Sequence, residues 1–369
     1  MAVDDFARRL VRWQRAAGRH DLPWQGTRDP YRIWVAEVML QQTRVDAVIP
    51  FYRRFLSRFP DLASLAQAPL DKVLGLWSGL GYYARARNLH EAARRIVEQH
   101  GGRFPRDAGS IAALPGLGRS SAAAIAAFAF GSRVAILDGN VRRVLCRAFG
   151  VEGFPGRPDV ERRLWSLAER LVPARGIRVY TQALMDLGAT VCTRARPACG
   201  RCPLVSGCAA AIERRTHELP APRPAARLPE RTSRMLVLLD HGRVLLERRP
   251  PAGIWGGLLS LPELPEDGSP EAFCVERLGC ELGELERLPA IRHGFTHFRL
   301  VIEPLLCLVR TRGMRCAQDG CVWLSRGELA AAALPAPVRR LLETLPGLSS
   351  GAAPRRPRRL PGSVPRQAH

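Results

Sequence analysis

Four cysteines lie within seventeen residues, in the segment CTRARPACGRCPLVSGC. They are Cys192, Cys199, Cys202 and Cys208, with the spacing C-x6-C-x2-C-x5-C. Four thiolates this close together can hold one metal centre, and ligation by cysteine alone suits zinc or a [4Fe-4S] cluster. Structural zinc sites typically use two C-x2-C pairs, whereas this segment has one. The spacing therefore favours a [4Fe-4S] cofactor at 192–208, held for structure because no open ligand position is implied.

A glycine-rich stretch, LPGLGRSS at 114–121, is the second candidate. Gly116 and Gly118 stand immediately before a helix of small residues. Such a turn directs backbone N–H groups of the helix amino terminus toward an anion, for example a phosphate. A turn of this kind can also simply connect two helices, and by itself the motif does not decide between these functions.

Two acidic residues could act as a catalytic pair. Glu37 lies in the apolar segment WVAEVMLQQT, where burial raises a carboxyl pKa and allows proton donation near neutral pH. Pairing with Arg44 or a hydrogen bond to Gln41 would explain this glutamate equally well. Asp138, in ILDGNVRRV, has the position of a helix N-cap. From the residues alone, the capping role is favoured for Asp138.

The charge balance suggests a polyanionic partner. The 369 residues include 56 basic and 34 acidic side chains, which gives a net charge of +22, and Lys72 is the single lysine. A GC-rich genome explains the preference for arginine over lysine but not the excess of bases over acids, so nucleic acid is the first candidate partner. No apolar run is long enough to span a bilayer, and no signal peptide is recognisable, which predicts a soluble, cytoplasmic protein.

The elements that carry these residues fall into two predicted domains. Apolar residues recur at helical spacing from Phe6 to about Ala211, which predicts an all-α domain over 1–217. A proline-rich linker follows at 218–230. Strand-like runs around Asp240-His241-Gly242 and in FRLVIEPLLCLVR predict an α+β domain over 231–345. The arginine- and proline-rich tail, 346–369, is expected to be disordered.

The order of the motifs resembles a known superfamily. The hairpin, the following LDGNV and the cysteine cluster are similar to the helix-hairpin-helix DNA glycosylases related to endonuclease III. LPWQGTRDPYRIWVAEVMLQQT, LWSGLGYYARARNL and YTQALMDLGATVCT closely resemble adenine DNA glycosylases of the MutY type, over nearly the whole first domain. ERRPPAGIWGGLLSLPE and RHGFTHFRL resemble the Nudix-like carboxy-terminal domain of the same family.

This resemblance implies a base excision repair enzyme that removes adenine mispaired with 8-oxoguanine or guanine in double-stranded DNA. It implies that Glu37 protonates adenine N7 and that Asp138 opposes the oxocarbenium-like sugar and can bond to it transiently. Asn140 and Ser120 would assist. Bifunctional members carry a lysine where this chain has Ser120, and with Lys72 as the single lysine an amine nucleophile is not expected. Hydrolysis without strand cleavage follows.

The resemblance also implies the residues that bind DNA. Around the flipped adenine it places Arg19, Trp24 and Gln182. Near the opposing lesion and the DNA phosphates it places Gln42, Leu80, Tyr82, Gly116 and Gly118. In the second domain, Phe295, Thr296 and His297 stand where the family senses 8-oxoguanine with a Phe-Ser-His turn. Core packing is the competing explanation for Trp24 and Leu80, and a β-turn with a buried Phe for Phe295.

Two other functions stay open on these observations. A bifunctional glycosylase and lyase for damaged pyrimidines is disfavoured by the missing lysine and the second domain. The other alternative is a DNA-binding iron–sulfur protein with idle carboxylates. Nucleotide hydrolysis by the second domain is not expected, because no R-E-x-x-E-E box occurs between Leu258 and Leu288. A monomer without membrane contact is expected.

Overall fold

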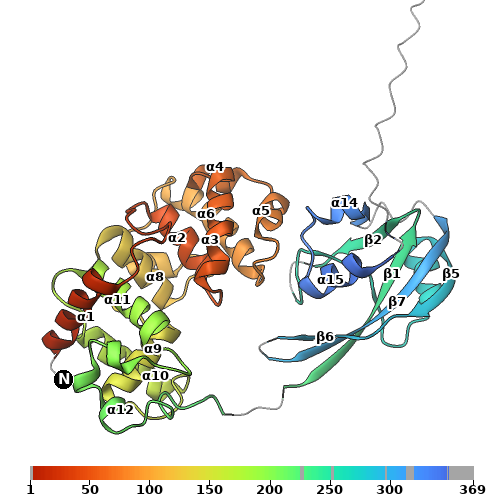
Figure 1. Cartoon of the computed structure of the whole chain (residues 1–369). Helices are drawn as coiled ribbons and strands as arrows, with labels where there is room; N and C mark the ends of the chain where they lie inside the picture. The colour runs from red at the N-terminus through yellow and green to blue at the C-terminus, as the bar shows by residue number, and fades with distance from the viewer. Residues whose placement is uncertain are drawn as a thin grey trace, which may run out of the picture. The chain divides into compact units, whose positions relative to one another are not determined.

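The computed structural model describes residues 3–224, 228–250, 253–295, 297–312, 320–346 and 348. The chain divides into two compact units, Met1–Arg227 and Leu228–His369. Figure 1 shows that the first is built from helices and the second on a sheet. This confirms the predicted fold class, an all-α domain followed by an α+β domain. Thr296 and the tail from 349 onward lie outside the described residues.

The first unit is a succession of short helices that glycines and prolines separate. α2 begins at Pro30 because the Asp29 carboxylate accepts a hydrogen bond from the Tyr31 amide at 2.9 Å. α6 and α9 end at Gly101 and Gly150, both in the left-handed conformation. The helices are α1 (Val3–Ala17), α2 (Pro30–Leu40), α3 (Val45–Arg58), α4 (Leu62–Gln67), α5 (Leu70–Trp77), α6 (Ala84–His100), α7 (Ala108–Ala112), α8 (Arg119–Ile125), α9 (Gly139–Phe149), α10 (Pro158–Arg170), α11 (Ile177–Asp186) and α12 (Ala209–Ile212).

Helices from both ends of this unit share a core. Phe6 of α1 packs with Leu145 of α9, Leu164 of α10 and Leu184 of α11, all fully or almost fully buried. Figure 1 shows α1 beside α11, although about 160 residues separate them in sequence. α11 continues into a π-helical turn, Leu187–Val191, from which the cysteine loop starts. The core therefore brings the amino-terminal helix against the helix that leads into this loop.

The glycine-rich stretch forms a tight connection between α7 and α8. Gly116 has φ +77°, and a Cβ there would lie 2.7 Å from the Asn88 Cβ. Gly118 is the N-cap of α8, with φ −90° and open space around it. The structure thus confirms the predicted turn before a small-residue helix. Of the two glycines, Gly116 is the one that the backbone requires.

The second unit is built on a mixed sheet in which β1 is central. The strand order is β3-β2-β1-β7-β5, with β4 on β1, β6 on β7 and β8 on β2. β1 runs parallel to β7 and antiparallel to β2. The elements are β1 (Glu230–Asp240), β2 (Arg243–Arg248), β3 (Leu259–Ser260), β4 (Glu263–Leu264), α13 (Pro270–Phe273), β5 (Cys280–Arg287), β6 (Ile291–Gly294), β7 (Arg299–Arg312), β8 (Cys321–Ser325), α14 (Arg326–Leu329) and α15 (Ala336–Thr344).

Both faces of β1 are covered, which explains its continuous apolar run. Val237 packs on one face with Val338 and Leu342 of α15. Leu238 packs on the other face with Cys274 and Leu278 of the π-helical turn after α13. Alternate residues of a strand point to opposite faces, so burial on both sides removes the polar alternation.

The chain between the units differs from the prediction at its start. The predicted linker begins at residue 218, but Leu219 is buried and its carbonyl accepts a hydrogen bond from Arg147 Nε at 2.7 Å. The amino-terminal part of the linker is therefore packed on the helical unit. No helix in the described part of the chain has the length and apolarity needed to cross a membrane.

Replacing Gly116 by alanine is expected to destabilise the protein by more than about 1 kcal/mol. Alanine pays about 1–2 kcal/mol for the left-handed conformation, and its methyl group also overlaps Asn88. Thermal unfolding of Gly116→Ala and Gly118→Ala checks this, because Gly118 has neither constraint. Equal melting temperatures for the two variants would contradict the assignment.

Candidate active site

A cavity of about 1060 Å³ opens in the helical unit. Its walls come from α1 and the following loop, from α2, from the amino ends of α8 and α9, and from α11. Both candidate carboxylates line it. Seven of the predicted site residues lie here together: Arg19, Trp24, Glu37, Gln42, Asp138, Asn140 and Gln182.

Glu37 projects from α2 into this cavity. Most residues of its helix are apolar and buried, and Ile33, Ala36 and Leu40 line the cavity around it. Burial raises the pKa of Glu37 from 4.5 to about 8, and the negative charge of Asp138 acts in the same direction. The predicted desolvation is confirmed. A carboxyl group with this pKa carries a proton at neutral pH.

Asp138 faces the same cavity from the position immediately before α9. It is the N-cap, and its Oδ1 accepts a hydrogen bond from the Val141 amide at 2.7 Å. Burial raises the pKa of Asp138, while this amide, that of Asn140 and the charge of Arg143 oppose the rise. The capping role and the placement of Asp138 in the cavity therefore coexist. The cap fixes where the carboxylate points.

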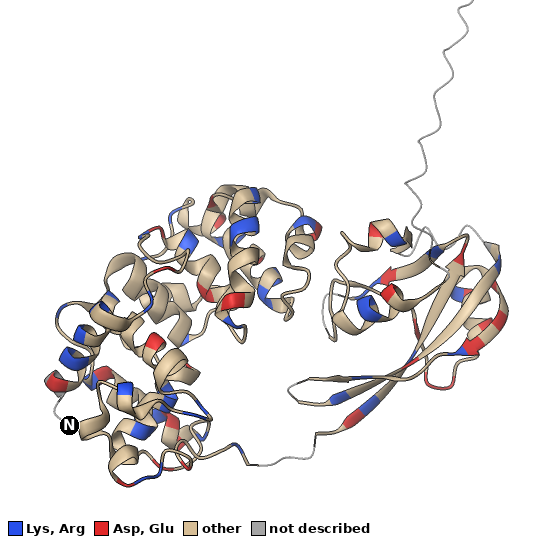
Figure 2. Cartoon of the chain, in the orientation of Figure 1, with Lys and Arg blue, Asp and Glu red and all other residues tan. Residues whose placement is uncertain are grey.

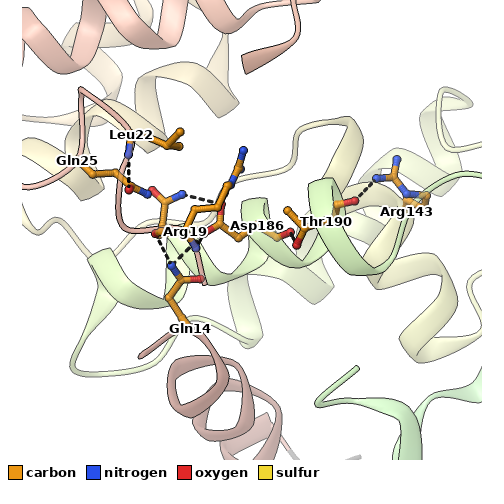
Figure 3. A network of polar contacts seen from close by, with 9 residues as sticks. Gln14, Arg19, Leu22, Gln25, Arg143, Asp186 and Thr190 are labelled. Carbon is orange, nitrogen blue, oxygen red and sulfur yellow. Dashed lines mark hydrogen bonds and ion pairs between the residues drawn. The ribbon is translucent and has the colours of Figure 1, made fainter. Parts of the chain in front are cut away.

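Asn140 is held tightly beside Asp138. Arg143 donates from Nη2 to Asn140 Oδ1 at 2.8 Å and to the Gly188 carbonyl at 2.8 Å, while its Nε donates to the Cys192 carbonyl at 2.7 Å. Figure 3 shows Arg143 at one end of a network of polar contacts that also includes Thr190 and Asp186. A Cβ on Gly188 would lie 2.5 Å from the Asn140 Cβ, so the close approach of these segments requires glycine.

Ser120, which the resemblance implies would assist the reaction, lies outside the cavity lining. The residues that line the cavity include Ser121 and not Ser120. The Ser120 hydroxyl accepts a hydrogen bond from the Leu137 amide at 2.9 Å, which ties α8 to the segment preceding Asp138. Ser121 Oγ and the Gly116 carbonyl lie 3.4 and 3.3 Å from Gln41 Nε2, which connects the hairpin to α2.

The other predicted contact residues lie outside the cavity lining. Leu80 is buried, as core packing requires, and Tyr82 is half exposed with φ +49°. In the second unit, Phe295 and His297 belong to the turn between β6 and β7, where the Phe295 amide donates to the Phe298 carbonyl. The Phe295 ring stacks on Phe298, with a centroid distance of 4.5 Å, and it is Phe298 that is fully buried.

Arg85 joins two of the predicted contact segments, and sequence reasoning missed it. It is buried, and it donates to the Met39 carbonyl at 2.8 Å, to the Gln41 carbonyl and to the Gly81 carbonyl at 3.1 Å. It thereby caps the carboxyl end of α2 and holds the loop that carries Leu80. In a chain with so many arginines, no signal distinguishes this one.

Asp186 was also missed. It is fully buried at the end of α11 and receives hydrogen bonds from Gln14, Arg19 and Gln182. Figure 3 shows Gln14 and Arg19 meeting at its carboxylate. The signal for this residue was available, because Asp186 is an acid in the apolar stretch YTQALMDLGAT, as Glu37 is in its own helix.

The four clustered cysteines line one small cavity of the same unit, and Arg147 borders it. Arg147 Nη1 lies 3.4 Å from Cys192 Sγ and also donates to the Thr193 carbonyl at 2.7 Å. Among the described residues, no group of three His, Cys, Asp or Glu side chains is placed to hold a single metal ion. The convergence of the thiols on one cavity is what the structure shows.

Most of the charged residues that line the large cavity are arginines. Figure 2 shows basic residues on many helices of this unit. Lining the cavity are Arg15, Arg19, Arg28, Arg44, Arg143 and Arg178. The acids Glu37 and Asp138 thus share the cavity with positively charged side chains, which attract polyanions.

Comparison with known proteins agrees with this geometry. The model of the HhH-GPD superfamily of base excision DNA repair proteins matches residues 35–170, and a NUDIX domain model matches 234–344. The adenine DNA glycosylase of Buchnera aphidicola subsp. Baizongia pistaciae is 32% identical over 91% of this chain and 95% of its own length. The chain belongs to the adenine DNA glycosylase family. The human adenine DNA glycosylase is 34% identical, over 95% of this chain and 75% of its own.

Membership of the adenine DNA glycosylase family makes this chain a DNA repair enzyme that hydrolyses N-glycosyl bonds. Among solved structures, a thermostable thymine-DNA glycosylase is 31% identical and covers 57% of this chain and 97% of its own, with a TM-score of 0.53. The helical unit therefore shares its fold with a thymine-DNA glycosylase.

Glu37→Gln is expected to stabilise the protein increasingly as the pH rises from about 4.5 to about 8. The pKa of Glu37 is higher in the folded state than in the unfolded chain. Between pH 4.5 and pH 8 the unfolded chain therefore loses this proton and the folded protein keeps it, which lowers the free energy of unfolding as the pH rises. Glutamine cannot ionise and avoids this loss. Urea unfolding of the variant and the wild type at several pH values checks it.

The matched control is Glu98→Gln, at an exposed position of α6. It is expected to leave the pH dependence of unfolding nearly unchanged. A stability gain in Glu37→Gln that stays constant between pH 5 and pH 8 would contradict the raised pKa.

Proposed function

We propose that this protein removes adenine paired with 8-oxoguanine or guanine from duplex DNA by hydrolysis, without cutting the strand. The observation that carries this proposal is the placement of two carboxyl groups in one arginine-rimmed cavity, with the pKa of Glu37 raised to about 8. Glu37 can give a proton, and the amides of Val141 and Asn140 together with Arg143 favour the ionised form of Asp138 against the effect of its burial. The identity of the base follows from the adenine DNA glycosylase relatives.

The chemistry needs one acid and one stabilising anion. Glu37 gives its proton to N7 of the flipped adenine, which makes the base a better leaving group. The bond between C1′ and N9 then breaks, and its electron pair leaves with adenine. The Asp138 carboxylate stabilises the positive charge that develops on the sugar. Water supplies the oxygen that bonds to C1′, and its released proton returns to the carboxylates.

The absence of strand cleavage follows from the available nucleophiles. A lyase reaction needs an amine that attacks C1′, and Lys72 is the single lysine in the sequence. It lies on α5, away from the cavity lining. Ser120 stands at the hairpin position where bifunctional members of the superfamily carry a lysine. Its hydroxyl accepts a hydrogen bond from the Leu137 amide.

The target base has to leave the duplex to reach this cavity. Arg19, Trp24 and Gln182 line it and are proposed to surround the adenine. Gln42 lies at its rim, and Arg85 connects the neighbouring residue Gln41 to the loop of Leu80 and Tyr82. We propose that these segments contact the opposing base. In the second domain, Phe295, Thr296 and His297 are proposed to sense 8-oxoguanine.

The cysteine loop is proposed to bind a [4Fe-4S] cluster. Cys192, Cys199, Cys202 and Cys208 supply four thiols to one cavity, and the donor set fits this cofactor. When bound, the cluster would tie the loop together and supply no step of the hydrolysis. Arg147 and Arg143, which bond to backbone carbonyls of the loop, would then be held in place.

Base release is tested with duplexes carrying adenine opposite 8-oxoguanine, adenine opposite guanine, and thymine glycol. Strand breaks are scored before and after hot alkali. Breaks are expected only after alkali and only in the adenine strands, because hydrolysis leaves an intact abasic strand. Glu37→Gln and Asp138→Asn are expected to lose base release and keep DNA binding. Alkali-independent breaks, or unchanged activity in both variants, would overturn the proposal.

The cluster is tested on the purified protein by iron and acid-labile sulfide analysis. Equal amounts of iron and sulfide are expected in the wild type and a large loss in Cys199→Ser. Cys146→Ser, a buried cysteine outside the loop, is the control and should retain both. Stoichiometric zinc in place of iron would contradict the assignment.

A further inference from the structure

We propose that Asp186 selects adenine indirectly, by fixing the orientation of the Gln182 side-chain amide. This inference rests on the proposed function and adds a positioning residue for base specificity. Asp186 touches neither the substrate nor the reacting atoms in this scheme. It acts through Gln182, which lines the cavity where the base is expected to bind.

The Asp186 carboxylate is fully buried and surrounded by donors. Its Oδ2 accepts from Gln14 Nε2 at 2.9 Å and from the Arg19 amide at 3.0 Å. Its Oδ1 accepts from Arg19 Nε at 2.7 Å and Nη2 at 2.6 Å, and from Gln182 Nε2 at 2.9 Å. Figure 3 shows Gln14 and Arg19 converging on this group. A buried charge with this many partners has one stable arrangement.

This arrangement decides which end of the Gln182 amide is available to a base. The two ends of a glutamine amide differ only in that one donates and the other accepts. A carboxylate ion-paired with Arg19 can only accept, so it binds the NH2 end of Gln182. The carbonyl oxygen Oε1 is then left for the cavity. Without the carboxylate, the amide could rotate by half a turn and offer either end.

An acceptor in this place distinguishes adenine from 6-oxopurines. Adenine has an amino group on C6 that donates, whereas guanine and hypoxanthine have a carbonyl oxygen that accepts. Gln182 Oε1 can accept a hydrogen bond from the amino group. Against a 6-oxo group, two acceptors would face each other in a desolvated site, which is unfavourable. Arg19, fixed by the same carboxylate, is held beside Gln182.

The test is a ratio of rates, because a purely structural role would lower both rates together. Base release is measured under single-turnover conditions from duplexes with adenine or hypoxanthine opposite 8-oxoguanine. Each rate is divided by acid-catalysed release from the same duplex without protein. We expect the wild type to favour adenine by about tenfold or more. In Asp186→Ala, this preference should fall to less than about threefold, since either end of the amide can then face the base.

Two variants act as controls. Asp186→Asn keeps a carbonyl oxygen that can accept from Gln182, so it should keep the preference for adenine even if both rates fall. Gln14→Met removes a donor to Oδ2 but leaves the Gln182 contact on Oδ1, so it should lower stability and keep the ratio. Circular dichroism and DNA binding report whether each variant is folded.

The outcomes separate this inference from the proposed function. A wild type that releases neither base overturns the proposed function itself. A wild type that releases adenine and hypoxanthine equally well overturns the inference, even if Asp186→Ala does not fold. A folded Asp186→Ala in which both rates fall and the ratio is kept also overturns it.

Discussion

The chemistry of this enzyme depends on keeping one carboxyl group away from water. The carboxyl of Glu37 meets apolar side chains of its own helix and the charge of Asp138, and both make ionisation unfavourable. Asp186, a buried acid at the end of α11, has different surroundings, with five donor atoms around its two oxygens. One fold thus gives two acids contrasting surroundings, apolar around Glu37 and rich in donors around Asp186. The helices and caps around the cavity serve to maintain that difference.

Much of this could be predicted from the sequence, because the relevant signals are local. Three features can each be recognised within ten residues of sequence. They are the acid in an apolar helix, the glycine pair before α8, and the turn at Asp240-His241-Gly242. The structure confirms the raised pKa of Glu37, the tight turn and the hairpin, where Asp240 pairs with Arg243. Local patterns are reliable here because each one follows from the backbone or from nearby solvation.

What could not be predicted depends on contacts between distant segments. Asp186 meets Arg19 across 167 residues, and Gly188 meets Asn140 across 48. Ser120 was assigned to the reaction by its place in the motif, but its hydroxyl bonds to the Leu137 amide, and it is Ser121 that reaches the cavity. In the second unit, the burial of β1 on both faces likewise depends on elements that are distant in sequence. Spacing along the chain carries no information about such pairings.

The contacts of Arg85 have a consequence for how this family can vary. One guanidinium satisfies carbonyl groups from the end of α2 and from the loop at Leu80, so it couples the positions of the two segments. A substitution that shifts one of them changes the hydrogen bonds available to the other. Among descendants of this sequence, changes in the two segments should therefore be inherited together, and a change in one alone should be selected against. The Arg85 side chain is the link that makes the end of α2 and the loop at Leu80 vary together.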